Sequence, residues 1–343
     1  MNEPLLRLRD LKVHFPLGAK RLWQPQSVLK AVDGVSLDLY RGRTLGLVGE
    51  SGCGKSTLAR ALTGMTAITS GELAFEGRDM SRGSAADWQR LRRDVQMIFQ
   101  DPLASLDPRM TVGQIVAEPL RHLRKDMSRA QRGERVRAML ERVGLSGAQI
   151  NRYPHEFSGG QCQRIGIARA LVVEPKVLIC DEPVSALDVS IQAHIIELLQ
   201  ELQAEFDIGV LFIAHDLAVV RQISDDVTVM YLGRVMEQAR GQALFERPAH
   251  PYTRALLSAV PRPDPLVERS RERIRLPGDL PSPSDPPSGC VFRTRCPWAR
   301  ADCAQQRPAL RTMNASQQAA CLHAETIAEA TAGTVAEGEC LAV

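Results

Sequence analysis

The sequence lacks the long apolar runs that cross a membrane. No stretch of its 343 residues approaches the roughly 18 consecutive apolar residues that a membrane span needs. The segment 1–10 carries charged side chains among its leucines and has no apolar core of the kind found in a secretory signal. We therefore expect a cytosolic protein whose membrane contacts come through partners.

A strong excess of charge of one sign is absent as well. The 43 Lys and Arg residues nearly balance the 40 Asp and Glu residues, which leaves a formal net charge of +3. Nucleic-acid-binding domains usually carry a pronounced basic face, and this balance is too mild to indicate one. We therefore expect no nucleic-acid partner. The sequence also contains no internal repeat.

The residues that are present are typical of a soluble globular protein with more than one domain. Hydrophobic residues make up 44% and charged residues 24% of the chain, and both proportions are ordinary. A length of 343 residues exceeds one average domain and suits a large domain with a smaller one. Proline becomes dense after Pro248, which predicts a linker and an irregular C-terminal module. The stretch 324–343 is expected to fray.

Strand and helix patterns alternate along the chain, which predicts an α/β sheet. The expected helices are Lys55–Leu62, Ile191–Leu202 and Ser128–Val143, the last with capping-box spacing at Ser128 and Gln131. Strand patterns vanish between Met80 and Asn151, which predicts an inserted helical subdomain. The expected strands are Leu6–Val13, Val35–Leu39, Thr44–Val48, Val177–Cys180 and Val210–Ala214, followed by a hairpin of Val227–Tyr231 and Arg234–Glu237.

A glycine-rich loop follows the expected strand Thr44–Val48. Glycines let backbone N–H groups surround phosphate oxygens, and the N-terminus of the following helix points at the same anion. Lys55 would reach the β- and γ-phosphates of ATP, and Ser56 would offer its hydroxyl to Mg²⁺. A glycine turn with a chance lysine is the alternative, which the flanking strand and helix disfavour. The loop fits the pattern G-x-x-x-x-G-K-[ST] and consists of Gly49, Glu50, Ser51, Gly52, Cys53, Gly54, Lys55, Ser56 and Thr57.

Two acids end a later buried strand pattern. Val177–Cys180 is followed by Asp181 and Glu182, and ligands of open α/β sheets lie at the carboxyl ends of the strands. Asp181 would hold Mg²⁺ through water, and Glu182 would polarise the attacking water as general base. A solvated acidic turn is the alternative, and the phosphate loop makes that reading less favoured.

A second glycine-rich segment precedes the helix pattern 162–171. A serine hydroxyl and bare backbone amides at a helix N-terminus form an anion site by geometry, although a simple helix cap is the alternative. The segment resembles the signature motif of the ABC ATPase family, in which this surface closes over the γ-phosphate held by the other subunit. It consists of Phe157, Ser158, Gly159, Gly160 and Gln161.

Further positions match the same family. Gln100 resembles the Q-loop residue, which contacts Mg²⁺ and couples to the membrane subunit, and His215 resembles the switch histidine that touches the γ-phosphate. Phe15 is the candidate for the aromatic residue that stacks on adenine, and an ordinary core phenylalanine is the alternative. The resemblance places the D-loop, which lies across the dimer seam, at Ser185, Ala186, Leu187 and Asp188.

The chain is most similar to the ATPases of oligopeptide and dipeptide importers. The resemblance implies a P-loop ABC ATPase core with a mixed sheet, an inserted helical subdomain and a small C-terminal module rich in cysteine and proline. The implied core comprises 1–85 and 161–247, the helical subdomain 86–160, the C-terminal module 248–330 and the tail 331–343. The likeness rests on Tyr153–Arg164, Pro183–Ser190, His250–Leu256, an insertion at Lys20–Pro25 and Gly289–Pro297.

This likeness also implies partners. A periplasmic binding protein delivers peptides, two membrane-spanning permease subunits form the channel, and a D-type and an F-type ATPase pair on the cytoplasmic face of the bacterial inner membrane. A second copy of the chain is the alternative to the D-type partner. Two ATP molecules are then held between the phosphate loop of one chain and the signature motif of the other. We expect Ala104–Glu118 to dock the membrane subunits, with a plain subdomain surface as the alternative.

Other functions are open to a sequence of this kind. An importer of another solute, such as an oligosaccharide or nickel, would share the same motifs. A soluble ABC ATPase of translation or DNA repair is disfavoured, because the chain has one cassette and no heptad run. A nucleotide-gated module without hydrolysis is disfavoured by the presence of Glu182 and His215.

Four cysteines in the C-terminal part could hold a metal. Cys290, Cys296, Cys303 and Cys321 are spaced by x5, x6 and x17, and a reducing cytosol argues against disulfides. Four thiolates can bind zinc or a [4Fe–4S] cluster. Close cysteine pairs typical of zinc modules are absent from this spacing, and some peptide-importer ATPases of this type carry a cluster on such a tail. We therefore rank the cluster first, reduced buried cysteines second and zinc third.

Overall fold

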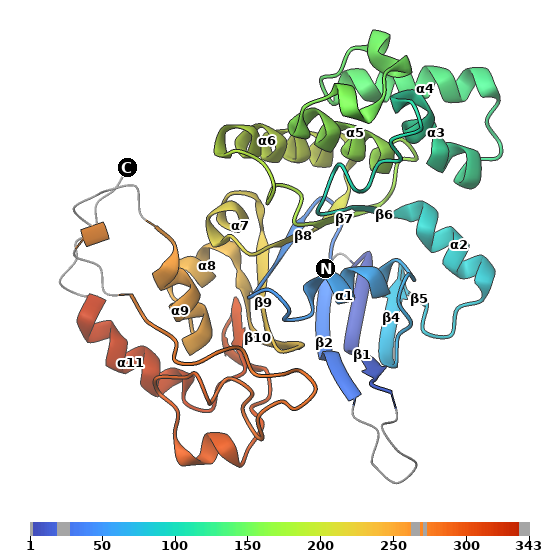
Figure 1. Ribbon diagram of the computed structural model, residues 1–343. Coiled ribbons are helices and arrows are strands. Elements are labelled where there is room, and N and C mark those ends of the chain that lie inside the picture. The colour runs from blue at the N-terminus through green and yellow to red at the C-terminus, as the bar shows by residue number, and fades with distance from the viewer. Residues whose placement is uncertain (1–2, 19–27, 262–267, 270–272, 336–343) are drawn as a thin grey trace. The chain divides into compact units, whose positions relative to one another are not determined.

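The computed structural model describes residues 3–18, 28–261, 268–269 and 273–335 (Figure 1). The insertion at Lys20–Pro25 lies outside these residues. The strands are β1 (Leu6–Pro16), β2 (Val28–Leu39), β3 (Thr44–Val48), β4 (Ser70–Phe75), β5 (Arg78–Asp79), β6 (Val95–Ile98), β7 (Val177–Asp181), β8 (Gly209–Ala214), β9 (Asp226–Tyr231), β10 (Arg234–Arg240), β11 (Arg311–Asn314) and β12 (Gln317–Ala319).

Helices separate many of these strands. The α-helices are α1 (Lys55–Leu62), α2 (Ala85–Asp94), α3 (Val112–Leu123), α4 (Arg129–Arg142), α5 (Gly159–Leu171), α6 (Val189–Phe206), α7 (Leu217–Ile223), α8 (Gly241–Glu246), α9 (Pro251–Ala259) and α11 (Ala324–Val335). Short 3₁₀ turns occur at η1 (Gly147–Asn151), η2 (Pro154–Glu156) and η3 (Ala301–Ala304). Within the part of the chain that the structure describes, no helix is both long and apolar enough to cross a bilayer.

The strands form two sheets. The smaller sheet has the order β2-β1-β4-β5, and the larger has the order β11-β12-β10-β9-β3-β8-β7-β6. Strands β6, β7 and β8 run parallel, with Val95 opposite Val177 and Val177 opposite Gly209. Strands β9, β10 and β12 run antiparallel, with Ala239 opposite both Val227 and Gln317. The larger sheet is therefore mixed, as the sequence analysis expects.

The chain forms two compact units. Unit 1 comprises Met1–Leu11, Ser36–Gly46 and Ser56–Ala214, and unit 2 comprises Lys12–Val35, Leu47–Lys55 and His215–Val343. In unit 1, β7 and β8 are buried along their whole length, as expected for apolar parallel strands covered on both faces. In unit 2, the expected hairpin of β9 and β10 is present around Leu232 and Gly233. The phosphate loop up to Lys55 belongs to unit 2, whereas Ser56 begins a segment of unit 1.

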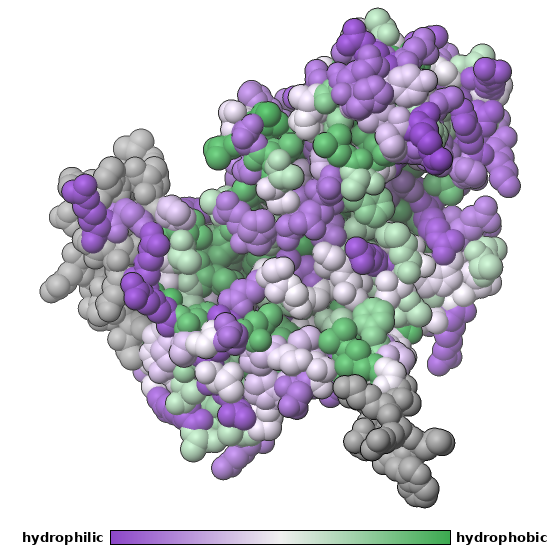
Figure 2. All heavy atoms as spheres, viewed as in Figure 1, coloured by the Kyte–Doolittle hydropathy of each residue, from purple (hydrophilic) through white to green (hydrophobic). Residues whose placement is uncertain are grey.

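The helices α3, α4 and α5 of unit 1 pack against one another. The predicted capping box of α4 is confirmed, because the Ser128 hydroxyl accepts from the Gln131 N–H and the Gln131 side chain accepts from the Ser128 N–H. The helix is followed by Gly144 with a φ of 75°, the left-handed conformation that favours glycine. Hydrophilic side chains cover most of the visible surface around α4 (Figure 2). Its buried face consists of Val136, Met139 and Leu140.

Two expectations about secondary structure are wrong. Strand β6 lies between Met80 and Asn151, where no strand was expected, and pairs in parallel with β7. Its four residues are too few to give a periodic pattern, and the polar Gln96 interrupts them. The stretch 324–343 was expected to fray, but Ala324–Val335 forms α11. Residues 336–343 lie outside the described part of the chain.

Candidate functional site

The phosphate loop of unit 2 owes its shape to three glycines. Gly49, Gly52 and Gly54 have φ values of 154°, 80° and 107°, which residues with a Cβ rarely adopt. A Cβ on Gly54 would lie 2.1 Å from the carbonyl oxygen of Ala31, and one on Gly49 would lie 2.2 Å from that of Met230. The loop backbone therefore packs directly on β2 and β9.

Lys55 is folded back over this loop. Its ammonium donates to the carbonyl oxygens of Gly49 at 2.7 Å and Glu50 at 3.1 Å, and the residue is 5% exposed. A buried ammonium that bridges two loop carbonyls fixes the loop and holds a positive charge beside it. Burial raises the pKa of the Cys53 thiol despite the nearby ammonium, so this side chain is neutral near pH 7.

In unit 1, the predicted magnesium residues Ser56 and Asp181 meet. The Ser56 hydroxyl donates to Asp181 Oδ1 at 3.0 Å, and Asp181 is 4% exposed at the end of β7. Ser56 and Thr57 lie in the first turn of α1. A hydroxyl and a carboxylate that share a hydrogen bond present two oxygen atoms of the kind that Mg²⁺ prefers. Both residues were predicted from the sequence to bind the same magnesium ion.

Glu182, the predicted general base, is bonded to the predicted Q-loop residue. The Gln100 side chain donates from Nε2 to Glu182 Oε2 at 3.0 Å. Glu182 adopts a φ of 48°, and its N–H donates to the Ile213 carbonyl oxygen at 2.9 Å. A glutamate in the left-handed region is uncommon. The bond to β8 holds this conformation and turns the carboxylate toward Gln100.

The signature-like segment lies at the surface of unit 1. Ser158 caps α5 and accepts from the Gln161 N–H at 3.4 Å, while the Gln161 side chain accepts from the Ser158 N–H at 3.0 Å. Ser158 and Gly159 are exposed, whereas Gly160 is buried. A Cβ on Gly160 would lie 2.7 Å from Ile191 Cγ2, so close packing on α6 requires glycine there. The exposed start of α5 can receive an anion from a second molecule.

The remaining predicted residues lie at exposed or half-exposed positions. The D-loop residues Ser185, Ala186 and Asp188 are exposed, and the Ser185 hydroxyl donates to the Glu182 carbonyl oxygen at 3.1 Å. His215 of unit 2 follows β8 directly and is exposed. Phe15 at the end of β1 is 38% exposed. The alternative reading of Phe15 as an ordinary core residue is therefore wrong, and its role toward adenine stays a prediction.

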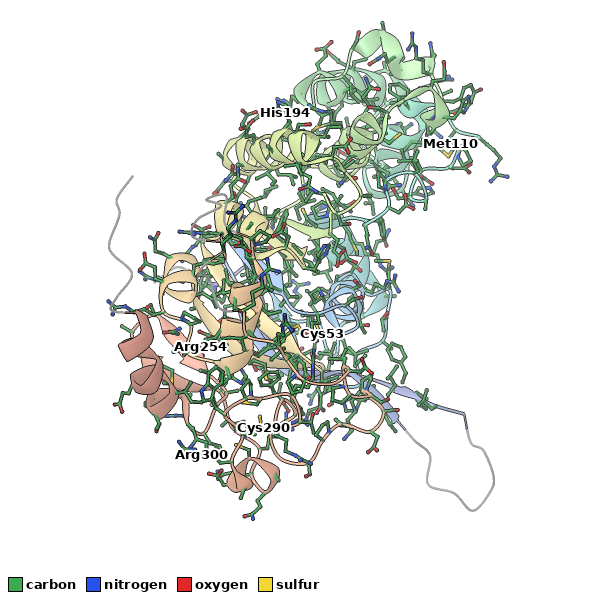
Figure 3. The ribbon with its side chains drawn as sticks, turned by 60° about the vertical axis from the view of Figure 1, so that its left-hand side comes forward. Cys53, Met110, His194, Arg254, Cys290 and Arg300 are labelled. Atoms are coloured by element: carbon green, nitrogen blue, oxygen red, sulfur yellow. The ribbon has the colours of Figure 1, made fainter. Side chains whose placement is uncertain are left out.

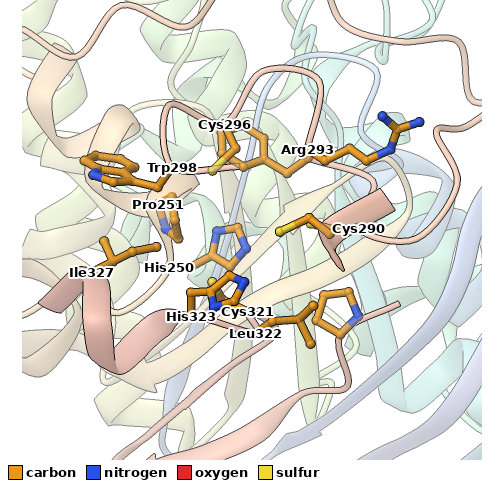
Figure 4. Close-up of a pocket in the computed structure, with 13 residues that line it drawn as sticks. His250, Pro251, Cys290, Arg293, Cys296, Trp298, Cys321, Leu322, His323 and Ile327 are labelled. Atoms are coloured by element: carbon orange, nitrogen blue, oxygen red, sulfur yellow. The ribbon is translucent and has the colours of Figure 1, made fainter. Parts of the chain in front are cut away.

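The four C-terminal cysteines line one cavity in unit 2. Cys290, Cys296, Cys303 and Cys321 share its wall with His250 and other residues, and Figure 4 shows three of these cysteines around it. Burial raises the pKa of Cys296 to about 12, and the neighbouring thiols add to the rise. Burial likewise raises the pKa of Cys321 to about 11. The thiols of Cys296 and Cys321 are therefore neutral on their own, and a cation among them would reverse the penalty on ionisation.

The spacing of the thiols bears on the kind of metal. Sulfur atoms around one tetrahedral zinc ion lie about 3.8 Å apart, because each Zn–S bond is about 2.3 Å. Among the described residues, the group of three ligand atoms that all lie within 4.8 Å of one another is Asp302, Cys303 and His323. No three of the four cysteine sulfurs form such a group. Among the described residues, the four thiols are therefore not gathered closely enough for one zinc ion.

Two residues that no sequence pattern predicted hold the phosphate loop. The Arg295 guanidinium donates to Glu50 Oε2 at 2.6 Å, and the Glu50 N–H donates to the Tyr252 hydroxyl at 2.9 Å. All three residues belong to unit 2. These partners lie 245 and 202 positions from Glu50 in the sequence. No local pattern could have linked them to the loop.

Two family models match separate parts of the chain. The model described as "ABC transporter" matches residues 32–185, and the model described as "Oligopeptide/dipeptide transporter, C-terminal region" matches residues 236–303. The fold also resembles that of a dimeric ATP-binding cassette, MJ0796, bound to ADP and Pi. The TM-score is 0.61 at 27% identity, with 68% of this chain and 98% of that chain covered. The α/β fold, mixed sheet and phosphate loop are those of an ABC transporter ATPase, which binds ATP.

Relatives that match most of the chain indicate which kind of ABC transporter ATPase it is. The chain is 60% identical to the oligopeptide transport ATP-binding protein OppF of Salmonella typhimurium over 308 residues, which are 89% of this chain and 92% of the relative. It is 51% identical to the oligopeptide transport ATP-binding protein AppF of Bacillus subtilis, over 93% of this chain and 97% of the relative. The chain belongs to the oligopeptide-transport family of ABC transporter ATP-binding proteins.

Proposed function

We propose that this chain hydrolyses ATP to power the import of oligopeptides across the inner membrane of a bacterium. The proposal is supported by relatives at 60% identity over 89% of the chain, which carry oligopeptide transport in their names. The observation that carries the chemistry is the contact between Glu182 and Gln100 at 3.0 Å, next to the contact between Ser56 and Asp181 at 3.0 Å. These contacts support the proposal that Glu182 is the base and that Gln100, Ser56 and Asp181 bind magnesium.

The residues divide the work of hydrolysis among them. The phosphate loop with Lys55 would bind the β- and γ-phosphates, and Ser56, Asp181 and Gln100 would hold Mg²⁺. Glu182 orients the attacking water and draws a proton from it. His215 contacts the γ-phosphate. Positioning and charge stabilisation of this kind supply most of the rate in phosphoryl transfer.

A complete site requires a second ATPase subunit. Ser158 and Gly159 are exposed at the start of α5, where they can contact a second subunit. A related cassette is dimeric with ADP and Pi bound. The partner is a D-type subunit or a second copy of this chain. Each partner would supply its Ser158-like serine and glycine amides to the γ-phosphate held by the other.

Coupling to the membrane runs through the helical subdomain, residues 86–160. The segment Ala104–Glu118 is the proposed contact with the two permease subunits, which receive peptides from a periplasmic binding protein. Beside it, Leu103 is 55% and Phe99 37% exposed, and exposed large apolar side chains favour contact with another protein. The chain would therefore lie peripherally at the cytoplasmic face of the inner membrane. The core segments 1–85 and 161–247 and the module 248–330 complete the proposed domains.

We test the base assignment with Glu182→Gln in the full-length chain. The variant keeps the side-chain shape and loses the carboxylate, so steady-state ATP hydrolysis should fall by about 10²–10⁴-fold, the usual contribution of a general base. ATP binding should persist, and ATP should hold the dimer closed in size-exclusion chromatography. Hydrolysis at the normal rate would show that Glu182 is not the base.

We infer that the four C-terminal thiols hold an iron–sulfur cluster. Cys290, Cys296, Cys303 and Cys321 line one cavity and are spaced more widely than the ligands of one zinc ion. A bound cluster would cross-link a module that is too small for a core of its own. Anaerobically purified protein should be brown, contain iron and lose both on substitution of Cys290 and Cys296 by serine. Colourless protein without iron would remove the cluster from the proposal.

A further inference from the structure

The phosphate loop contains a carboxylate close to the place where phosphates bind. Glu50 follows Gly49 directly, and its side chain is 28% exposed. ATP brings several negative charges to this loop, so an unpaired carboxylate there would oppose binding. The charge of Glu50 therefore needs an opposite charge nearby.

Arg295 of the C-terminal module supplies that charge. Its guanidinium lies 2.6 Å from Glu50 Oε2, and its side chain is 11% exposed. Burial would lower the pKa of Arg295, but the Glu50 carboxylate and the Tyr231 hydroxyl outweigh burial and raise it. The Arg295 guanidinium is therefore charged and largely shielded from water, and its pair with Glu50 is stronger than a pair at an open surface.

The backbone of Glu50 is held from the same side. The Tyr252 hydroxyl accepts its N–H at 2.9 Å. Tyr252 is fully buried, and its ring contacts those of Tyr231 and Phe292 at centroid distances of 4.8 and 5.3 Å. An aromatic cluster of this kind fixes the hydroxyl in one position.

A single short segment connects these contacts with the cysteine cavity. Phe292 and Arg295 lie between Cys290 and Cys296 in sequence, and the Arg295 N–H donates to the Phe292 carbonyl oxygen at 3.0 Å. Cys290, Phe292 and Cys296 line the cavity. Figure 3 shows Cys290 in the module and Cys53 in the phosphate loop, both in unit 2. The segment 290–296 thus faces the thiols and carries the arginine that reaches the loop.

We propose that Arg295 is a positioning residue for ATP binding, through which the cysteine-lined C-terminal module holds the phosphate loop in its binding conformation. The inference rests on the proposed ATP site. Arg295 neutralises the charge of Glu50, and Tyr252 fixes the peptide group between Gly49 and Glu50 at the start of the loop. Loss of Arg295 leaves the Glu50 carboxylate without its ion-pair partner, and one side of the phosphate loop then lacks a contact with the C-terminal module.

The test is the affinity of the full-length chain for Mg-ATP. Arg295→Met should weaken binding about tenfold, which corresponds to about 1.4 kcal/mol. The KM for ATP should rise in parallel, while kcat at saturating ATP should change less than twofold. Arg295→Lys should recover part of the affinity, because it restores the charge but not the guanidinium geometry. Arg300→Met is the matched control, since Arg300 is an exposed arginine of the same module.

A double variant separates the ion pair from a general loss of structure. Glu50→Gln combined with Arg295→Met removes both charges, so it should bind Mg-ATP more tightly than Arg295→Met alone. Should Arg295→Met fail to fold, the double variant and Arg295→Lys allow the same comparison with wild type. Unchanged affinity of Arg295→Met, or equal weakness of the single and double variants, would overturn the inference. If wild type itself did not bind ATP, the proposed function would fail instead.

Discussion

The buried carboxylate of Glu237 stabilises unit 2 through its hydrogen bonds. Glu237 of β10 is 0% exposed, and three N–H groups point at its two oxygens. Oε1 accepts from the Ala249 N–H at 2.8 Å and from Gln317 Nε2 at 2.6 Å, and Oε2 accepts from the His250 N–H at 2.8 Å. These bonds join β10 to β12 and to the start of α9. Burial raises the pKa of Glu237, and the bonds oppose that rise.

Glu237→Gln should therefore destabilise unit 2. The amide can keep its oxygen toward Ala249 and Gln317, but its NH₂ group then faces the His250 N–H. One bond to a charged group is lost, and two buried donors are left without an acceptor. A hydrogen bond to a charged group contributes about 1.5–3 kcal/mol, and an unpaired buried donor costs about 1–3 kcal/mol. Because the lost bond and one of the unpaired donors are the same His250 N–H, only the two unpaired donors are counted, and we expect a loss of about 2–6 kcal/mol.

Urea unfolding followed by tryptophan fluorescence measures this loss. The chain has three tryptophans, and replacing Trp23 and Trp88 by phenylalanine leaves Trp298 of the C-terminal module as the reporter. The midpoint should fall without a change in slope. Glu246→Gln is the control, because Glu246 is exposed on α8 and should lose less than about 0.5 kcal/mol. Equal losses in the two variants would refute the assigned role of the Glu237 charge.

Two further substitutions test unit 2. Burial would raise the pKa of Asp33, but Arg234 at 2.6 Å outweighs it and holds the pKa below the usual 3.8. Asp33→Asn should cost about 3 kcal/mol in urea unfolding at pH 7. The difference from wild type should shrink as pH falls below 3.8 through the lower folded pKa. Exposed Asp285→Asn is the control and should cost less than about 0.5 kcal/mol at pH 7. Gly54→Ala should lower the free energy of unfolding by about 2–5 kcal/mol, because the new Cβ is strained and overlaps a neighbouring backbone. Gly52→Ala is the control, because the nearest atom to its Cβ lies 4.0 Å away, and it should cost about 1–2 kcal/mol. Equal costs in thermal unfolding would contradict the packing argument.

Local patterns in the sequence predicted those parts of the molecule that local forces determine. The capping box at Ser128 and Gln131 is made within one turn of α4, so its residues are visible at fixed spacing. The same holds for the glycine loop, because Gly49 and Gly54 stand at the fixed positions of the motif where the backbone requires glycine. The short strand β6 escaped prediction because its pairing with β7, rather than any pattern of its own, makes it a strand.

Contacts between distant segments could not be predicted in this way. Glu50 was predicted to bind ATP only as a member of the phosphate loop, and its bond to Arg295 spans 245 positions. Gln161 was predicted as part of the signature motif, and it also completes a capping box with Ser158. That second role follows from serine and glutamine three residues apart, so a closer reading of spacing could have found it.

Both the motif residues and distant segments of the chain determine how the phosphate loop can bind ATP. The motif itself supplies the amides, the ammonium of Lys55 and the hydroxyl of Ser56, and these suffice to predict where ATP binds. The conformation of the loop depends on atoms that the motif does not contain. The carbonyl oxygens of Ala31 and Met230 leave no room for a Cβ at the glycines, and the C-terminal module holds Glu50 by its backbone and its charge. Substitutions in the module should therefore change ATP affinity even though every motif residue is intact.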